Sequence, residues 1–526
     1  MTDPFCRDRL PPPEAQPEFL FTLPELAYPP ALNAAEELLD RHVREGRGAR
    51  RCIVAPGVAW TYGDVLDRAN RIANVLVDCG VCPGARVLLR APNTPMLAAC
   101  WLAVVKAGAV AVTTMPLYRA GELRHMIERS EPHVALCDER YLDELAIATA
   151  RLPVRTIPFG HAAAELERLM DGASPEFANA PTAADDVALI GFTSGTTGKA
   201  KATMHFHRDV LAVCDTYAAR VLRARPDDLF TGSPPLGFTF GLGGILLFPM
   251  RIGAATLLLE KAPPAELLRA IARYRVDVVF TAPIAYRAMI GMLEEHDWSS
   301  LRLCVSAGET LPAPIWEAWR DATGLKLLDG IGSTEMLHIF VGSGVDDARA
   351  GATGRVVPGY VAEIHDDDGR PVPAGTIGRL AVKGPTGCRY LDDERQTTYV
   401  RDGWNYPGDA YACDADGYFH YVARTDDMIV TAGYNVSGPE VEGALLAHPA
   451  VRECAVVAKP DEAHGTNIVK AYVVLETDAA VDADALVAFC KERLASYKAP
   501  RELEFVDALP RTETGKVQRY KLRARA

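Results

Sequence analysis

The chain has 526 residues, with 56 Lys and Arg against 69 Asp and Glu, and so carries a formal net charge of −13. Apolar residues make up 49% of the chain and charged residues 24%, which is ordinary globular usage and excludes wholesale disorder and collagen-like repetition. Since an acidic chain without a Lys/Arg run repels phosphate backbones, we expect no nucleic-acid partner.

The first residues of the chain are polar and rich in proline, without the apolar core of a secretion signal. The longest apolar stretches, 97–117 and 241–260, are interrupted by Lys106 and Arg251. Neither is the uninterrupted run of about 18 residues that a membrane span needs. We therefore expect a cytoplasmic protein without a membrane span.

Twelve cysteines are scattered along the chain at no repeating interval, which favours a reducing compartment over a disulfide scaffold. Cys79 and Cys82 form one C-x-x-C. A metal site needs two more ligands nearby, and a redox site needs a thioredoxin-like context. We therefore interpret this pair as buried thiols at the end of a helix.

The pattern from residue 62 onward alternates between helix and strand. Apolar residues at helical spacing predict helices, and short apolar runs between them predict strands. The predicted elements are helices at 65–78, 96–107 and 265–274, and strands at 86–90, 109–113, 276–281 and 302–306. Alternation of this kind indicates βαβ units and a parallel sheet.

The pattern of predicted secondary structure changes twice towards the C-terminus. Between 355 and 383, short strands are broken by turn-like clusters, which indicates a small β-barrel or sandwich. After 424–427 the pattern becomes a compact α+β one. Its predicted elements are helices at 438–447 and 483–494, and strands at 453–458 and 469–475.

Together these patterns predict an α/β fold with a main boundary near Asp426. The expected N-terminal domain, 1–425, contains two α/β subdomains and the small β-barrel, and the expected C-terminal α+β domain spans 426–526. At roughly 100 to 200 residues per domain, this agrees with the three or four folding units that the length suggests.

An apolar strand at 188–192 runs into a loop with the composition of a phosphate cradle, Thr193 to Lys201. Its two glycines permit close backbone approach, its four hydroxyls offer donors, and its second lysine adds a mobile positive charge, which is what a polyphosphate needs. The spacing is not that of P-loop NTPases. The alternative is a solvated Ser/Thr/Gly turn.

The segment FTSGTTGKAKATMHFH, which contains this loop, resembles the phosphate loop of the adenylate-forming superfamily of acyl-CoA synthetases, firefly luciferase and peptide-synthetase adenylation domains. Three further motifs follow in the family's order: GIGSTE at 330–335, GWNYPGD at 403–409 with RTDD at 424–427, and PRTETGK at 510–516. The resemblance covers essentially the whole chain and is strong from about 190 to 522. It implies that the C-terminal domain is mobile.

The resemblance implies two steps at one site. A carboxylate attacks the α-phosphate of ATP to give an acyl-adenylate and pyrophosphate, and a thiol, that of coenzyme A, then displaces AMP to give a thioester. The first step brings two anions together, so the protein must neutralise charge and hold an in-line geometry. ATP, Mg²⁺ and coenzyme A are the expected cofactors.

The matched positions imply a set of ATP-binding residues. The phosphate loop and its lysine would hold the β- and γ-phosphates, and further positions would accept from the adenine amino group and the ribose hydroxyls. These residues are Thr193, Ser194, Gly195, Thr196, Thr197, Gly198 and Lys201 for the phosphates, Asp329 for the adenine, and Asp409 with Arg424 beside it for the ribose.

Three matched residues would act on the reacting groups. Thr334 would contact the α-phosphate, and Glu335 would hold Mg²⁺ together with phosphate oxygens, since Mg²⁺ prefers one or two carboxylates plus phosphate and water. Lys516 would reach in from the C-terminal domain to stabilise charge at the reacting carboxylate and the α-phosphate. Without the resemblance, Lys516 would be an ordinary surface charge.

A single lysine cannot serve both steps if the thiol must enter where it sits. In the family the C-terminal domain rotates between the steps, and the hinge position here is Asp426, a polar residue at the predicted domain boundary. After rotation, Gly433 would line a narrow tunnel for pantetheine. A simple turn glycine before Val436 is the alternative for Gly433.

The segments 333–340 and 234–243 resemble the benzoate–CoA ligase branch, and 204–210 with 432–442 lean towards 2-aminobenzoate–CoA ligase. The resemblance implies a flat, apolar acyl pocket suited to an aromatic ring. Its expected residues are Phe238, Thr239, Phe240, Ala307, Gly308, Ile331, Gly332, His338 and His207. As an alternative, the aromatic residues belong to the hydrophobic core. For His207, a local hydrogen bond is an equal alternative to substrate contact.

We therefore predict an ATP-dependent aryl-CoA ligase (AMP-forming), acting on a small aryl carboxylic acid of the benzoate or 2-aminobenzoate type. The alternatives are an adenylation enzyme that loads an aryl acid onto a carrier protein, a medium-chain fatty acyl-CoA ligase, and a catalytically dead nucleotide-sensing scaffold. Retention of Glu335, Asp409, Arg424 and Lys516 argues against the scaffold. A homodimer is compatible with the sequence, which does not determine the oligomeric state.

Overall fold

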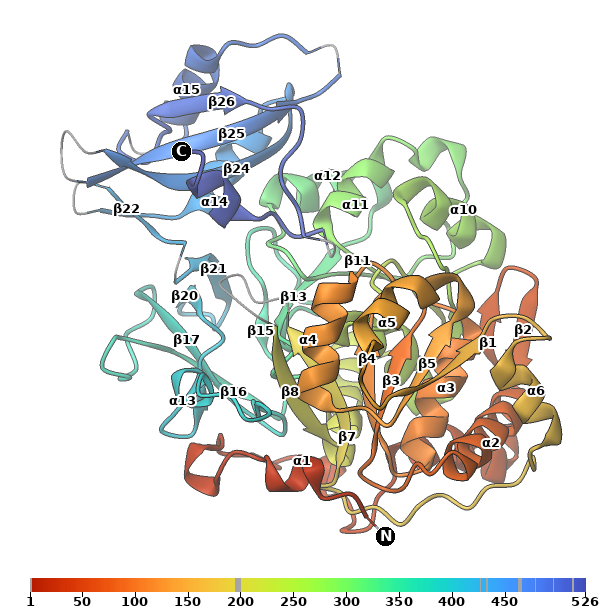
Figure 1. Cartoon of the computed structure of the whole chain (residues 1–526). Helices are drawn as coiled ribbons and strands as arrows, with labels where there is room; N and C mark the ends of the chain where they lie inside the picture. Colours follow the sequence, from red (N-terminus) through yellow and green to blue (C-terminus); the bar gives the residue numbers. More distant parts are fainter. Residues whose placement is uncertain are drawn as a thin grey trace.

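The structure is a computed structural model (Figure 1) and describes residues 2–193, 200–425, 427–431, 434–461, 466–477, 479–494, 496–512 and 515–526. It has the expected α/β architecture, with a large N-terminal body of several sheets and a small C-terminal body beside it. Within the described residues, no helix is long and apolar enough to cross a membrane. All twelve cysteines are free thiols, and Cys79 and Cys82, predicted as buried, are half-buried.

The first α/β unit is a six-stranded sheet that is parallel except at its last strand. In sheet order its strands are β6 (Arg155–Phe159), β5 (Val134–Asp138), β3 (Arg86–Arg90), β4 (Val110–Thr114), β7 (Val187–Thr193) and β8 (Lys201–Phe206). Val87 and Leu89 belong to one core cluster and Leu88 to another. Because successive strand residues point to opposite faces, this sheet is buried on both faces, as is usual for the parallel sheet that the alternation predicted.

Helices cover both faces of this sheet. Those on one side are α2 (Tyr62–Asp78), α3 (Pro95–Lys106) and α6 (Glu165–Gly172), and those on the other are α4 (Ala120–Ser130) and α5 (Leu142–Thr149). A capping box fixes the start of α2: Thr61 Oγ1 accepts from the Asp64 amide at 3.1 Å, and the Asp64 carboxylate accepts from the Thr61 amide at 2.8 Å.

The second α/β unit is a nine-stranded sheet. In sheet order its strands are β15 (Arg355–Val356), β14 (Ile339–Gly342), β13 (Leu327–Gly332), β12 (Leu303–Ser306), β11 (Val278–Thr281), β9 (Leu229–Gly232), β10 (Ala255–Leu257), β1 (Arg51–Ala55) and β2 (Val58–Thr61). Its helices include α7 (His207–Val213), α8 (Thr239–Leu242), α10 (Pro264–Tyr274), α11 (Pro283–Ile290) and α12 (Ala313–Thr323). Strands β9 to β13 are parallel, so their carboxyl ends meet at one edge.

The short-strand region forms an antiparallel sheet. Its strands are β16 (Val361–His365), β17 (Ile377–Lys383), β18 (Val400–Arg401), β19 (Trp404–Asn405), β20 (Asp409–Cys413) and β21 (Phe419–Arg424). The region predicted at 355–383 as a small β-barrel or sandwich therefore contributes only part of this sheet. Strands as far along as β21 complete it, because β20 pairs with both β17 and β21.

The C-terminal body has its own core and a three-stranded sheet. Its elements are the hairpin β22 (Ile429–Thr431) and β23 (Tyr434–Val436), the sheet strands β24 (Val451–Asp461), β25 (Thr466–Leu475) and β26 (Glu502–Phe505), and the helices α14 (Gly438–Leu446), α15 (Ala483–Lys491) and α16 (Arg519–Arg523). The division of the chain at 425/426 stays a prediction, and Asp426 lies outside the described residues.

Candidate active site

The predicted phosphate loop connects two antiparallel strands. β7 ends at Thr193 and β8 begins at Lys201, and these two residues are paired across the strands. Thr193 is half-buried, and its hydroxyl has no partner among the described residues. The loop positions between them, Ser194, Gly195, Thr196, Thr197 and Gly198, lie outside the described residues.

Lys201 and Glu335 meet at a buried tyrosine. The ammonium of Lys201 donates to the hydroxyl of Tyr390 at 2.5 Å, and this hydroxyl donates to Glu335 Oε1 at 2.5 Å. The direct distance from Lys201 Nζ to Glu335 Oε1 is 3.5 Å. Glu335 is only 6% exposed. The structure therefore brings the lysine of the phosphate loop and the predicted metal-binding carboxylate together.

Thr334 lies against the same strand as the phosphate loop. A Cβ built on Gly191 of β7 would lie 3.0 Å from Thr334 Cγ2 and 3.7 Å from Thr239 Cγ2, so both threonines face this strand. The backbone oxygen of Thr334 accepts from His205 Nε2 at 2.8 Å. The residue predicted at the α-phosphate thus lies next to one predicted in the acyl pocket.

Asp409 and Arg424 pair across neighbouring strands. They are opposite each other at the ends of β20 and β21, and Arg424 donates to Asp409 Oδ2 at 3.1 Å. Gly408 has a φ of +85°, and a Cβ there would lie 2.6 Å from the guanidinium of Arg424. Glycine in the Gly-Asp motif therefore permits both the turn and the arginine's position.

Asp329, at the carboxyl end of the parallel strands, lies near the same group. It is 8% exposed, and burial raises its pKa far above the ordinary value of a carboxyl. Burial also raises the pKa of Tyr411, and the carboxylates of Asp409 and Asp329 both add to that increase. The two predicted nucleotide-binding acids therefore both act electrostatically on one tyrosine.

Lys516 reaches this group of acids from the C-terminal body. The turn before it is closed by Gly515, with a φ of +89°, and by the Lys516 amide, which donates to Thr512 Oγ1 at 3.1 Å. Its side chain is exposed to solvent, but the surrounding protein lowers its pKa. The carboxylates of Glu309, Asp409 and Glu335 act in the opposite direction.

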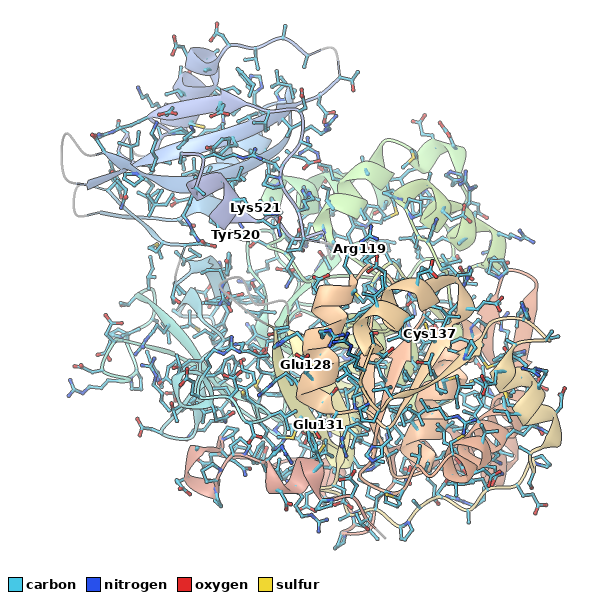
Figure 2. The ribbon with its side chains drawn as sticks, viewed as in Figure 1. Arg119, Glu128, Glu131, Cys137, Tyr520 and Lys521 are labelled. Carbon is cyan, nitrogen blue, oxygen red and sulfur yellow. The ribbon has the colours of Figure 1, made fainter. Side chains whose placement is uncertain are left out.

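Two arginines connect the bodies in this arrangement. Arg511 donates to Glu309 at 3.2 Å, and Arg287 of α11 donates to the Val451 carbonyl at 2.5 Å and to Glu476 at 3.1 Å. Figure 2 places Tyr520 and Lys521 of α16 on the side of the C-terminal body that faces the N-terminal body. The lysine-bearing face is therefore the one turned towards the acids.

His338 lies inside an aromatic cluster. It is 2% exposed, and its ring centroid lies 4.5 Å from that of Phe248, 5.7 Å from Phe240, 5.8 Å from Tyr217 and 6.4 Å from Phe280. Burial lowers its pKa to about 3, so the ring is neutral near pH 7. Nε2 donates to the Phe240 carbonyl at 3.4 Å.

The contacts of the His338 ring do not include a hydrogen bond to its second nitrogen, Nδ1, among the described residues. The edge with Cδ2 and Nε2 faces Gly243, where a Cβ would lie 2.3 Å from Cδ2. Nδ1 therefore points the other way, and it has no hydrogen-bond partner among the described residues. The hydroxyl of Tyr217 is likewise buried without a partner. A neutral acceptor and a hydroxyl thus remain available in otherwise apolar surroundings.

The other predicted acyl-pocket residues lie on strand ends and on the loop before α8. Phe238 and Ile331 are half-buried, Ala307 is buried, and Gly308 is exposed with a φ of +90°. At Gly332, a Cβ would lie 2.6 Å from the backbone oxygen of residue 338, so this position has no room for a side chain.

His207 lies against the N-terminal segment of the chain. It is fully buried at the start of α7, its Nδ1 accepts from the Ala34 amide at 3.1 Å, and burial lowers its pKa to about 4. This is the local hydrogen bond that the sequence offered as the alternative to substrate contact. His205, two residues earlier, is the histidine that contacts Thr334.

Three residues of the site, His205, Glu309 and Tyr390, are not among those predicted from the sequence. His205 could have been predicted from strand alternation, because it lies four residues after Lys201 and the two side chains therefore share one face of β8. Tyr390 has no local signal, since it reaches Glu335 through an isolated bridge to Thr203. The predicted tunnel and hinge positions lie outside the described residues, at 433 and 426.

The chain matches the family described as AMP-binding enzyme over residues 39–389 and the AMP-binding enzyme C-terminal domain over residues 440–516. It is 35% identical to the benzoate–CoA ligase of Thauera aromatica over 96% of this chain and 98% of the relative. It resembles the crystal structure of the anthranilate CoA ligase AuaEII with anthranoyl-AMP, with a TM-score of 0.91 and 33% identity over 96% and 99% of the two chains. It also resembles a benzoate CoA ligase from Burkholderia xenovorans LB400, with a TM-score of 0.87 and 33% identity over 94% and 100%.

Proposed function

Because the chain belongs to the AMP-binding enzyme family, among the AMP-forming aryl-CoA ligases, we propose that it converts benzoate or 2-aminobenzoate to the CoA thioester. An oxygen of the aryl carboxylate attacks the α-phosphorus of ATP and pyrophosphate leaves. The thiol of coenzyme A then attacks the carbonyl carbon, and AMP leaves. The relatives and the aromatic cluster around His338 support an aryl acid over an alkyl one.

One observation supports this proposal above the others: Lys516 of the C-terminal body lies within electrostatic range of Glu309, Asp409 and Glu335 of the N-terminal body, and Arg511 of the same turn donates to Glu309 at 3.2 Å. An ammonium at this place would neutralise the negative charge that builds up as carboxylate and α-phosphate approach. Thr334 would hold the α-phosphate from the other side. We propose that this arrangement serves the first step.

The nucleotide would lie along the edge where the strands end. Lys201 and the loop after Thr193 would hold the β- and γ-phosphates, Asp329 would accept from the adenine amino group, and Asp409 would accept from the ribose hydroxyls. Both acids interact electrostatically with the buried Tyr411. Arg424 orients Asp409 by its hydrogen bond.

The residues near Glu335 fit Mg²⁺ carried in by the triphosphate. No group of three or more His, Cys, Asp or Glu side chains within the described residues could hold a metal by itself. Both contacts to Glu335, from Tyr390 and Lys201, go to Oε1. A single carboxylate of this kind suits an ion that takes its other ligands from phosphate and water. Bound there, Mg²⁺ would neutralise phosphate charge.

The second step needs the thiol where Lys516 lies in this arrangement. We propose that the C-terminal domain rotates at Asp426, which withdraws the lysine, and that Gly433 then lines the entry of pantetheine. The bridges of Arg287 and Arg511 hold the first orientation only through partly exposed contacts. Contacts of this kind break at low cost, which rotation requires.

Pyrophosphate release tests the proposal. The purified enzyme is given ATP, Mg²⁺ and one acid from a panel of benzoate, 2-aminobenzoate, the hydroxybenzoates and hexanoate, with and without coenzyme A. We expect an aryl acid to give the highest rate and a CoA thioester as product. A higher rate with hexanoate would refute the aryl pocket. Pyrophosphate with an aryl acid but no thioester would favour the carrier-protein alternative.

A further inference from the structure

Tyr390 occupies the position between the phosphate-loop lysine and the predicted metal carboxylate. We propose that Tyr390 is a positioning residue that holds Lys201 and Glu335 ready for the triphosphate and its metal, an inference that rests on the function proposed above. The sequence motifs do not include Tyr390. Its hydroxyl lies 2.5 Å from both Lys201 Nζ and Glu335 Oε1.

The hydroxyl suits both neighbours at once. It has one donor and two acceptor lone pairs, so it donates to the carboxylate and accepts from the ammonium. A phenol is ordinarily protonated near pH 7, so the Tyr390 hydroxyl has a proton to donate. The ammonium of Lys201 also lies 4.5 Å from the centre of the Tyr390 ring. Tyr390 therefore fixes the direction of both charges.

The backbone around Tyr390 is anchored to β8, the strand that begins at Lys201. Thr203 forms a bridge with Tyr390, the Leu391 amide donates to the Ala202 carbonyl at 2.9 Å, and the Met204 amide donates to the Arg389 carbonyl at 2.8 Å. Segment 389–391 thus runs alongside the strand. The lysine and the tyrosine are carried by paired segments, so their separation is fixed.

A buried ion pair also anchors segment 389–391. Arg389 donates to Asp209 at 2.7 Å, and both side chains are fully buried. The side chain of Gln396 accepts from the Tyr390 amide at 2.8 Å. A tyrosine that only filled space would not need hydrogen bonds that hold its own amide and the residue before it. These contacts instead give the hydroxyl one location, between the two charged groups.

Without the hydroxyl, Lys201 and Glu335 lose the group between them and face each other directly. Their 3.5 Å separation would close to a direct ion pair, in which each charge neutralises the group that the ligand needs. A hydrogen bond to a charged group contributes about 1.5–3 kcal/mol. We therefore expect Tyr390→Phe to weaken ATP binding by roughly 10- to 100-fold, because 1.4 kcal/mol corresponds to a factor of ten.

The test compares Tyr390→Phe with the unaltered enzyme and with two matched variants. Tyr399→Phe removes a hydroxyl from the same cluster, but one bonded to Ser333 at 3.0 Å. Tyr360→Phe removes a buried hydroxyl outside the site, bonded to Thr386 at 2.9 Å. The dissociation constant of ATP with Mg²⁺ is measured by calorimetry without acid or thiol, and the affinity for Mn²⁺ in the presence of ATP by electron paramagnetic resonance.

Weaker ATP and Mn²⁺ binding in Tyr390→Phe alone, with a raised KM for ATP and a smaller change in kcat, would support the inference. Equal affinity in Tyr390→Phe and the unaltered enzyme would overturn it and leave the proposed function intact. An unaltered enzyme that binds no ATP would overturn both. A double-mutant cycle with Lys201→Gln adds a second measurement: additive losses would show that Tyr390 does not act through Lys201.

Discussion

Arg287→Ala should change the balance between the two half-reactions without touching the chemistry. Arg287 lies on α11 and donates to the Val451 carbonyl at 2.5 Å and to Glu476 at 3.1 Å, both in the C-terminal body. Its side chain is 24% exposed and that of Glu476 is 43% exposed. The carbonyl contact therefore contributes about 1 kcal/mol and the screened ion pair about 0.5 kcal/mol.

Together these contacts stabilise the orientation in which Lys516 faces the acids by about 1.5 kcal/mol, which corresponds to roughly a tenfold change in its population. Pyrophosphate release from ATP and the acid should fall by up to that factor. Thioester formation from supplied aryl adenylate should be unchanged or faster. The part due to Glu476 should shrink as salt is added, since exposed ion pairs are screened.

The matched control is Arg269→Ala, which removes an exposed ion pair with Glu266 on α10 and no contact between the bodies. It should leave both half-reactions as they are. An equal fall of both half-reactions in Arg287→Ala, or the same change in both variants, would refute the reasoning that these contacts select one orientation.

The remaining predictions concern the site and the core beneath it. Lys516→Ala should lower adenylate formation by about two or more orders of magnitude while sparing thioester formation from supplied adenylate, measured separately. The ammonium form of Lys516 is the active one, so the rate of pyrophosphate release should decrease as the pH rises through the lowered pKa of this lysine. Glu309→Gln removes a carboxylate that raises the pKa of Lys516, and it should therefore shift this decrease to lower pH. His338→Phe should favour benzoate over 2-aminobenzoate in the acid panel, because the unpaired Nδ1 is lost. Asp209→Asn should lower stability in urea by about 3–5 kcal/mol, since it leaves Arg389 buried without a charged partner.

The sequence predicts elements well where burial is uniform. Strand β3 lies at 86–90 as predicted, because every residue of it is buried and the apolar run has clear ends. The strand expected at 453–458 extends over Val451–Asp461 because pairing with β25 continues past its apolar centre into polar residues. Pairing depends on a partner strand, which local periodicity does not describe.

In the candidate site, too, some residues could be predicted from local sequence and others could not. Contiguous motifs predicted Glu335 and Asp409, and the structure brings both within electrostatic range of Lys516. Tyr390 could not be selected because its place depends on a bridge to β8 and on contacts that join distant parts of the chain. His205 and His207 show the limit of a motif. His205, near the end of β8, contacts Thr334, whereas His207, at the start of α7, contacts Ala34.

The charges of the site also explain how a polyphosphate can enter it. Lys201 lies beside Glu335, Arg424 beside Asp409, and Arg511 beside Glu309, so each of these cations already has a carboxylate. A triphosphate bound by Lys201, as we propose, would draw this ammonium away from Glu335 and leave the carboxylate to the metal that accompanies the phosphates. Arg424 donates to Oδ2 of Asp409 and so orients the carboxylate that we propose for the ribose hydroxyls. Pairing of this kind keeps buried charge compensated before the nucleotide arrives and supplies acceptors once it is bound.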